Sequence, residues 1–349
     1  MSDDPLVTIG VPTYNQASRL RKALESLAAQ DYSNLEIVIS DNASADNTPE
    51  VCGAFQQVRP FVRYHRNAST IPAFNNFEKV LLLAKGHYFM WAADDDLWDS
   101  TFVSTLVDYM RSDANLVLVA AEAQYMLEDG TRLPFFAEGQ AFYRYAGCGP
   151  PLPRLLAIAG HNYGNLIYGL YRREALLRRD GHTVMSVCRF TNEIPVFIQV
   201  CSRGHVRVCP KVLFYKTAAL PTYLQAAREY GVKQVVVQPR VGEVAEGSKT
   251  DVEQPASAQP VSVPRARRLM GFITRFGTFG LTRCRHSATV YHYHTHALGD
   301  IRRAIWTIDI SLPARLVLLA VFTKQLVAHL FKLVVVWQVQ DILPRKSRH

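Results

Sequence analysis

The sequence predicts an α/β protein with a mostly parallel sheet, helices on both faces of that sheet, and a helical region at the C-terminus. The first observation is that short β-branched runs alternate with amphipathic segments over the first 120 residues, a pattern typical of a parallel sheet covered on both faces. The second is that polar clusters follow three of the predicted strands. The third is size and composition, because 349 residues, 48% hydrophobic and 20% charged, suffice for roughly two globular domains.

The predicted strands are short apolar runs bounded by turn residues. The first run is rich in β-branched residues and is expected to stop at Pro12, because proline cannot donate to a strand ladder. The fourth run is strongly apolar and leads directly into three acids. The five predicted strands cover residues 6–11, 35–40, 61–65, 88–93 and 116–121.

The segments between these strands have the spacing of amphipathic helices. Leu20, Ala23, Leu24 and Leu27 fall on one stripe, which predicts a helix that packs this stripe on the sheet. The predicted helices of the first part cover residues 17–29, 48–57, 76–84 and 101–110. Farther along, the predicted elements are a basic helix over 172–179, an amphipathic helix over 191–202 and a strand over 206–213.

Polar side chains follow three predicted strands, at residues 13–15, 41–42 and 94–96. Because ligands gather at the carboxyl ends of parallel strands, these clusters are expected to converge on one edge of the sheet. The third cluster is three consecutive aspartates, called the acidic motif below, and desolvating it is costly unless a cation compensates. A divalent metal completed by a phosphate-bearing substrate is one solution. A solvated acidic loop is the alternative.

Several functional classes are disfavoured by missing patterns. There is no GxGxxG turn after the first strand and no GxxxxGK[ST] segment, which argues against a dinucleotide oxidoreductase and a P-loop enzyme. The six cysteines lack CxxC spacing and predict reduced thiols of a cytosolic protein rather than a zinc site. Residues 1–5 have no basic stretch followed by an apolar core, so no secretory signal is expected.

The excess positive charge lies in the last quarter of the chain. From Arg265 to the end there are 14 Lys and Arg against 3 Asp and Glu. Residues 312–339 are mostly apolar but are interrupted by basic side chains such as Arg315 and Lys324, which argues against a membrane-spanning helix. Helices lying on an anionic membrane and a helical subdomain packed on the rest of the protein both fit. Nucleic-acid binding is disfavoured because this region is not rich in aromatic residues and glycine.

Five segments, in order along roughly the first 215 residues, carry a resemblance to one known family. They are Val11-Pro12-Thr13-Tyr14-Asn15, residues 36–48, Asn75-Asn76-Phe77 before residues 86–89, residues 93–98 around the acidic motif, and residues 164–173. Together they are similar to the motifs of the family-2 glycosyltransferases, which have the GT-A fold. One such segment alone would be a weak signal, whereas five in the right order are specific.

The resemblance implies a donor site at the carboxyl edge of the sheet, where Asp41 would meet the nucleotide base. The residues expected to bind the donor are Pro12, Thr13, Tyr14, Asn15, Asp41, Asn76, Asp94 and Asp95. A Mg²⁺ or Mn²⁺ ion would be held by Asp96, with Asp94 assisting.

The resemblance also implies a general base at the start of a helix after residues 164–173. The family usually has an aspartate there, and this chain departs from the pattern with Glu193, which can do the same chemistry. The alternative for Glu193 is a charge that only stabilises the helix N-terminus. Arg172 and Arg173 are expected on a solvated basic helix face rather than at the donor phosphates.

The activity implied is an inverting transfer of sugar from a nucleotide-diphosphate sugar, a UDP-sugar first of all, to an acceptor hydroxyl in cell-surface polysaccharide or glycolipid synthesis. Residues 1–231 would be the catalytic domain, with a nucleotide-sugar half (1–121) and an acceptor half (122–231), and 232–264 a flexible linker. Residues 265–349 would touch the inner face of the cytoplasmic membrane peripherally. Two alternatives stay open: an enzyme whose acceptor is a polyprenyl phosphate, and an inert nucleotide-binding scaffold at the membrane.

Overall fold

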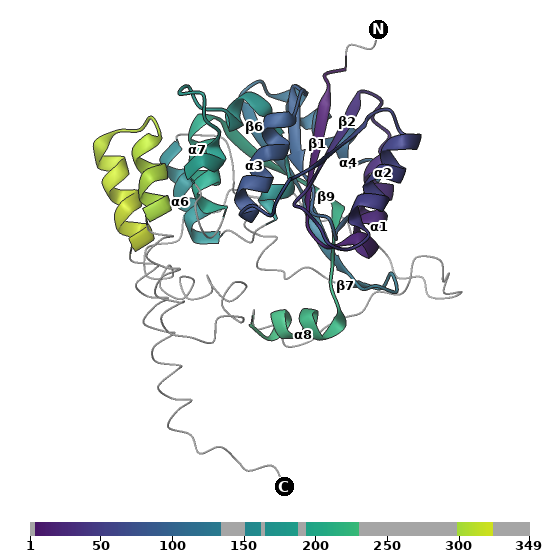
Figure 1. The fold of residues 1–349 in the computed structure, drawn as a ribbon. Helices are drawn as coiled ribbons and strands as arrows, with labels where there is room; N and C mark the ends of the chain where they lie inside the picture. Colours follow the sequence, from purple (N-terminus) through teal and green to yellow (C-terminus); the bar gives the residue numbers. More distant parts are fainter. Residues whose placement is uncertain (1–3, 134–150, 162–164, 188–192, 230–298, 324–349) are drawn as a thin grey trace.

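The computed structural model describes residues 4–133, 151–161, 165–187, 193–229 and 299–323. In these residues one twisted sheet runs through the molecule, with helices on both sides (Figure 1). The predicted linker and the first residues of the helix predicted over 191–202 lie outside the described part of the chain.

The sheet has nine strands within the described ranges, and eight of them follow the order β3-β2-β1-β4-β8-β6-β9-β5, with β7 paired to β6. The strands are β1 Val7–Thr13, β2 Leu35–Asp41, β3 Val62–Arg66, β4 Tyr88–Trp91, β5 Leu97–Trp98, β6 Leu116–Met126, β7 Arg132–Leu133, β8 Leu170–Arg172 and β9 His205–Thr217. The α/β class with a GT-A-like sheet is confirmed. The parallel part is β3-β2-β1-β4 together with the β6–β9 ladder, whereas β5, β7 and β8 run antiparallel to their neighbours.

Helices cover both faces of this sheet. The α-helices are α1 Ala17–Ala28, α2 Thr48–Val58, α3 Ala73–Leu83, α4 Phe102–Ser112, α6 Pro151–His161, α7 Ile194–Arg203 and α8 Leu220–Glu229. Short 3₁₀ helices are η1 Leu166–Tyr168, η2 Arg173–Leu176 and η3 Val184–Val187. Apolar side chains of α1, α2 and α4 pack on one face, and those of α3 and α7 pack on the other.

The strands divide their side chains between these two core layers because neighbouring residues point to opposite faces. In β4, Tyr88 and Met90 join the layer under α1, α2 and α4, while Phe89 and Trp91 join the layer under α3 and α7. All four side chains are buried, and each contributes roughly 1.5–3 kcal/mol by leaving water. The predicted α1 stripe of Leu20, Ala23, Leu24 and Leu27 is buried as expected.

The prediction that Pro12 ends the first strand is wrong, because β1 continues to Thr13. Pro12 stays in register with Ser40 of β2, whereas the ladder to β4 ends at Gly10 and Trp91. The Gly10 carbonyl oxygen accepts a hydrogen bond from the Ala92 N–H on the β4 side of β1. The backbone of Pro12, two residues later, faces the same side but lies beyond the end of the β1–β4 ladder. Its missing N–H therefore breaks no hydrogen bond.

The predicted basic helix over 172–179 is also wrong. Arg172 ends strand β8, where it pairs with Tyr88 of β4, and a single 3₁₀ turn follows. The Nε atom of Arg172 donates to the carbonyl oxygen of Leu116, 3.1 Å away. Pairing with strands distant in the sequence therefore overrides the local helical spacing.

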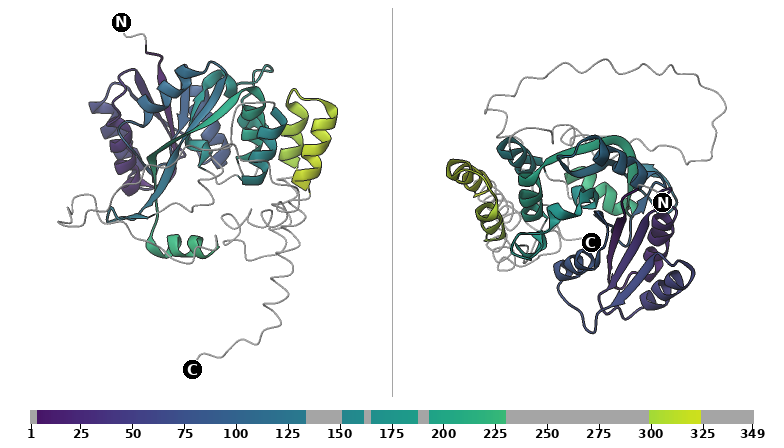
Figure 2. Two further views of the ribbon diagram at one scale, coloured as in Figure 1. Left: turned by 180° about the vertical axis from the view of Figure 1, so that it is seen from behind. Right: turned by 90° about the horizontal axis from the view of Figure 1, so that it is seen from above.

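Two helices of the C-terminal region, residues 299–307 and 312–323, lie beside α6 (Figures 1 and 2). Their buried side chains belong to the same core layer as α7, and these are Ile301, Ala304, Ile305, Ile308, Leu318 and Phe322. This part of the region thus packs on the sheet and its helices, which is one of the two alternatives. Within the ranges that the structure describes, no helix is both long and apolar enough to span a bilayer.

Candidate active site

A cavity of about 270 Å³ lies at the carboxyl edge of the parallel strands. Its walls come from the end of β1, the loop after β2, the start of α3, the acidic motif and η1. The lining residues are Pro12, Thr13, Tyr14, Gln16, Asn42, Ala73, Asn76, Phe77, Ala93, Asp94, Asp95 and Tyr168. Six of the eight residues predicted to bind the donor are thus brought together, and the remaining two, Asn15 and Asp41, stand just behind the wall.

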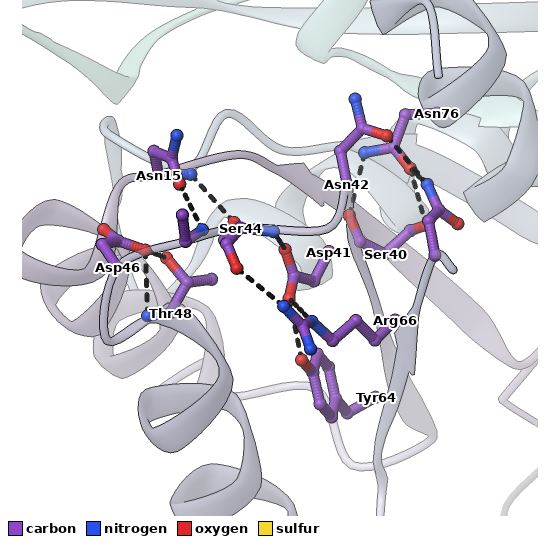
Figure 3. A network of polar contacts seen from close by, with 12 residues as sticks. Asn15, Ser40, Asp41, Asn42, Ser44, Asp46, Thr48, Tyr64, Arg66 and Asn76 are labelled. Carbon is purple, nitrogen blue, oxygen red and sulfur yellow. Dashed lines mark hydrogen bonds and ion pairs between the residues drawn. The ribbon is translucent and has the colours of Figure 1, made fainter. Parts of the chain in front are cut away.

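Asn15 joins the loops that follow β1 and β2 (Figure 3). Its N–H donates to the Ser44 hydroxyl at 2.9 Å, and its side-chain oxygen accepts from the Ala45 N–H at 2.7 Å. Asn15 has a φ of 53°, a left-handed conformation that asparagine adopts more readily than most residues. Asn15 therefore shapes the edge of the cavity rather than facing into it.

Asp41 is fully buried and holds the same loop together (Figure 3). One carboxylate oxygen accepts from the Ser44 N–H at 2.9 Å, and the other accepts from the Tyr64 hydroxyl at 2.9 Å and lies 3.3 Å from Nε of Arg66. Burial and then the hydrogen bond to Asp41 raise the pKa of Tyr64, so the phenol stays protonated. A carboxylate has about four acceptor sites. Ser44, Tyr64 and Arg66 take three of them, and the one left is buried behind the cavity wall. The contact of Asp41 with a nucleotide base therefore stays a prediction.

Asn76 lines the cavity but is almost wholly buried. Its side-chain oxygen accepts from the Ser40 hydroxyl at 2.7 Å and from the Asn67 amide at 3.1 Å, and its amide donates to the Ser40 carbonyl at 2.9 Å. Asn42 also lines the cavity, although the sequence did not single it out for donor binding. Its side-chain oxygen accepts a hydrogen bond from the Asn67 amide at 2.9 Å. This amide network fixes the β2 side of the cavity in one arrangement.

The three carboxylates of the acidic motif have different surroundings. Asp94 faces the cavity and accepts a 3.4 Å hydrogen bond from the Tyr14 N–H, and Asp95 is partly exposed. Asp96 is only 2% exposed. Its Oδ1 accepts from the Thr217 N–H at 2.8 Å, while its Oδ2 is buried without a hydrogen bond.

Burial raises the pKa of Asp94 to about 6 and that of Asp96 to about 6. The charge of Asp95 adds to both shifts, and the nearby ammonium of Lys216 lowers the pKa of Asp96. The cause is that two carboxylates are held in a poorly solvated corner beside a third.

These residues fit a divalent cation that a substrate helps to bind. In the described ranges no group of three or more His, Cys, Asp and Glu side chains has the arrangement of a metal site. Mg²⁺, however, is commonly held by one or two carboxylates together with substrate phosphates. Asp94 at the cavity wall and the unpartnered Oδ2 of Asp96 supply two hard oxygen donors of that kind.

Glu193 is the N-cap residue of α7 and does not line the cavity. Its carbonyl oxygen accepts from the Phe197 N–H at 3.1 Å, and its side chain makes no capping hydrogen bond. Tyr168 connects it to the cavity, because the charges of Asp96, Asp95 and Glu193 all add to the rise that burial causes in the Tyr168 pKa. The role of Glu193 as general base therefore stays a prediction.

Tyr168 is a site residue that the sequence did not single out, although it falls within the segment 164–173 that carried the resemblance. Gln16, Ala73 and Phe77 were missed as well, and only their closeness to predicted residues could have indicated them. Arg172 pairs with Tyr88 at the start of β4, and the Arg173 N–H donates to the His87 carbonyl oxygen. Both arginines therefore lie at the edge of the sheet opposite the acidic motif, where they do not reach donor phosphates in the cavity.

Comparison with known proteins agrees with this fold. Residues 8–163 match the family model described as glycosyl transferase family 2. This segment is thus a family-2 glycosyltransferase domain, and the sheet around it has the GT-A fold.

Two curated relatives match a part of the chain. Glycosyltransferase GlyG of Streptococcus pneumoniae is 30% identical over 139 residues, which are 39% of this chain and 45% of GlyG. Abequosyltransferase RfbV of Salmonella typhimurium is 34% identical over 116 residues, 32% of this chain and 35% of RfbV. The match therefore spans less than half the length of either relative.

Solved structures are similar over a longer part of the chain. TarS residues 1–349 of S. aureus superpose with a TM-score of 0.53 and 15% identity, covering 93% of this chain and 89% of TarS 1–349. The same TarS segment in complex with UDP gives a TM-score of 0.52 at 14% identity, over 93% and 89% of the two chains. At this identity the likeness shows the fold alone.

Proposed function

We propose that this chain is an inverting glycosyltransferase that moves a sugar from a nucleotide-diphosphate sugar, first of all a UDP-sugar, to an acceptor hydroxyl. One observation carries the proposal: the cavity at the carboxyl edge joins the loops after β1 and β2 to the acidic motif, where a buried oxygen of Asp96 makes no hydrogen bond. A buried carboxylate oxygen without a hydrogen bond is costly. The Lys216 ammonium lies 3.8 Å from it, and a divalent cation brought by a diphosphate would bind it directly. UDP bound to the TarS fold supports the choice of donor.

Donor binding would use the preformed loops. The amide network around Asn76 and the Asn15 bridge hold the nucleotide side of the cavity before any ligand arrives, which lowers the cost of ordering on binding. Asp41 would offer its remaining acceptor site to a base N–H. Asp94 and Asp96 would hold Mg²⁺ or Mn²⁺, which when bound neutralises the charge that develops on the departing diphosphate.

Glu193 would be the general base. An acceptor hydroxyl is too weak an acid to ionise alone, so a carboxylate that takes its proton as the new bond forms speeds the step by roughly 10²–10⁴-fold. One in-line displacement of this kind inverts the anomeric carbon. The place of Glu193 at the N-terminus of α7, in the chain after the segment that contributes Tyr168 to the cavity wall, supports this assignment.

Glu193→Gln tests the base and separates the two enzyme alternatives. We expect turnover to fall about 100-fold or more, with unchanged UDP affinity by calorimetry and an unchanged far-UV spectrum. Near-normal turnover would remove Glu193 as base and favour a polyprenyl phosphate acceptor, which is already ionised. Donor binding without turnover in the wild type would leave the scaffold alternative.

The experiment that tests the function as a whole is a panel of nucleotide sugars scored by thermal shift, with and without Mn²⁺. We expect UDP-sugars to raise the melting temperature more in the presence of Mn²⁺, and the best donor to be hydrolysed slowly or transferred when acceptors are added. A panel in which no nucleotide shifts the melting temperature would refute the proposal.

We also propose that the protein works peripherally at the inner face of the cytoplasmic membrane. The helices at 299–307 and 312–323 leave an apolar surface exposed, made by Trp306, Leu312, Leu316 and Val317, in the most basic part of the chain. Apolar side chains beside basic ones are the combination that binds anionic lipid surfaces.

The membrane proposal is tested by co-sedimentation with vesicles containing anionic lipid. Leu312→Glu combined with Leu316→Glu should abolish binding, whereas Val58→Glu, an exposed apolar position on α2, should not. Equal binding of both variants, or no binding by the wild type, would exclude this surface.

A further inference from the structure

The acidic motif has two cations beside it, and they differ in exposure. Arg19 lies 3.5 Å from Asp95 with 48% of its side chain exposed, so water weakens this pair. Lys216 lies 3.8 Å from Oδ2 of Asp96, a buried oxygen that makes no hydrogen bond, and 29% of the lysine side chain is exposed. A pair shielded from water in this way interacts more strongly than a surface pair at the same distance.

The end of β9 places Lys216 at this point. The next residue, Thr217, donates its N–H to Asp96 Oδ1 at 2.8 Å and its hydroxyl to the carbonyl oxygen of Asp95. The preceding residue, Tyr215, pairs with Leu97 directly after the motif. Backbone contacts on both sides therefore hold the base of the Lys216 side chain against the three acids.

The ammonium group also lies near a residue of the cavity wall. Its nitrogen is 5.8 Å from the ring centre of Tyr168, which lines the cavity, a distance at which a cation is attracted to an aromatic face. Lys216 thus lies close both to the buried oxygen of Asp96 and to the Tyr168 wall of the cavity, although it does not itself line the cavity. Neither the family resemblance nor the sequence pattern assigned it a role.

We propose that Lys216 is a counter-ion of the acidic motif that makes cation binding depend on the donor diphosphate. In the free protein the ammonium matches the charge of Asp96 and repels an entering divalent ion. A diphosphate brings negative charge that the ammonium and the divalent ion share, so each ligand strengthens the binding of the other. This inference rests on the proposed function, because the diphosphate is that of the nucleotide-sugar donor.

Linkage makes the proposal measurable without turnover, since UDP must raise Mn²⁺ affinity by the same factor as Mn²⁺ raises UDP affinity. Calorimetric titrations of Mn²⁺ into full-length protein, with and without saturating UDP, give this factor. Lys216→Met should bind Mn²⁺ about tenfold more tightly than wild type without UDP, and its coupling factor should fall by about the same amount. Lys216→Arg, which keeps the charge, should retain most of the coupling.

Lys211→Met is the matched control, because Lys211 is an exposed lysine on the same strand and its removal should leave both affinities unchanged. Lys216→Gln serves if Lys216→Met is poorly folded by far-UV circular dichroism. If wild type binds both ligands and the folded Lys216→Met or Lys216→Gln variant keeps its Mn²⁺ affinity and coupling factor, Lys216 has no such role. If wild type binds neither UDP nor Mn²⁺, the proposed function fails and takes this inference with it.

Discussion

Glu36 ties three strands together at the edge of the sheet opposite the cavity, and its replacement by glutamine is a test of the electrostatics inside this fold. Its Oε1 accepts from the Thr8 hydroxyl at 2.6 Å and the Lys85 N–H at 2.7 Å, and its Oε2 accepts from Arg63 at 2.8 and 3.1 Å. The Glu36 side chain is 11% exposed and that of Arg63 28%. Glu36→Gln keeps one oxygen but sets an amide NH₂ against the guanidinium.

The expected loss follows from these contacts. A hydrogen bond to a charged group contributes about 1.5–3 kcal/mol, and two of them are lost here, but the partial exposure of Arg63 discounts the sum. We expect Glu36→Gln to lower the free energy of unfolding by about 2–3 kcal/mol. At roughly 2–4 °C per kcal/mol for large domains, the melting temperature should fall by roughly 4–12 °C.

The pH dependence of the stability difference is a second, independent test. Burial raises the pKa of Glu36, but the hydrogen bonds from Thr8 and Lys85 and the charge of Arg63 outweigh it, so the pKa lies below its ordinary value. A carboxyl of this kind stabilises the fold above its unfolded pKa of about 4.3 and loses that contribution as pH falls through the folded pKa. The difference between wild type and Glu36→Gln should therefore be full at neutral pH and shrink in acid.

The assay is chemical and thermal unfolding followed by circular dichroism at neutral and acidic pH. Glu25→Gln, at an exposed position of α1, controls for the loss of a surface charge and should melt within about 1 °C of wild type. UDP affinity should not change, because Glu36 does not line the cavity. Equal melting of Glu36→Gln and wild type at neutral pH, or a difference that grows in acid, would refute the reasoning.

Three further predictions follow from packing and from the acidic motif. Asp96→Ala should stay folded yet lose Mn²⁺-stimulated turnover about 100-fold or more, and unchanged turnover would discard its metal role. Gly10→Ala should destabilise by about 1–3 kcal/mol in urea unfolding, since an added Cβ would lie 2.8 Å from Val80; wild-type stability would mean that α3 shifts freely. A chain ending at Pro264 should melt at lower temperature than the full chain, because it loses buried side chains of residues 299–323 from one core layer; identical melting would show that those helices add no stability.

The sequence alone was sufficient where the fold is local and parallel. Hydrophobic runs with β-branched residues located β1 to β4 and the helices between them, and the rule that parallel strands end at one edge brought Thr13, Asn42 and Asp94 to a common cavity. Burial of the α1 stripe followed from its 3.6-residue period. These features depend on residues that are close in sequence, and the spacing of such residues indicates which of their side chains face the core.

Contacts between residues far apart in sequence had to come from the tertiary structure. Arg172 is a strand residue because it pairs with Tyr88 and its side chain donates to the Leu116 carbonyl oxygen. The apolar side chains of residues 299–323 are buried because they pack on the core layer that contains α7. The different environments of the three acids have the same origin. Asp96 is buried and Asp95 is not because Thr217 and Lys216, some 120 positions onward, close over one of them, and no local pattern encodes a pairing at that separation.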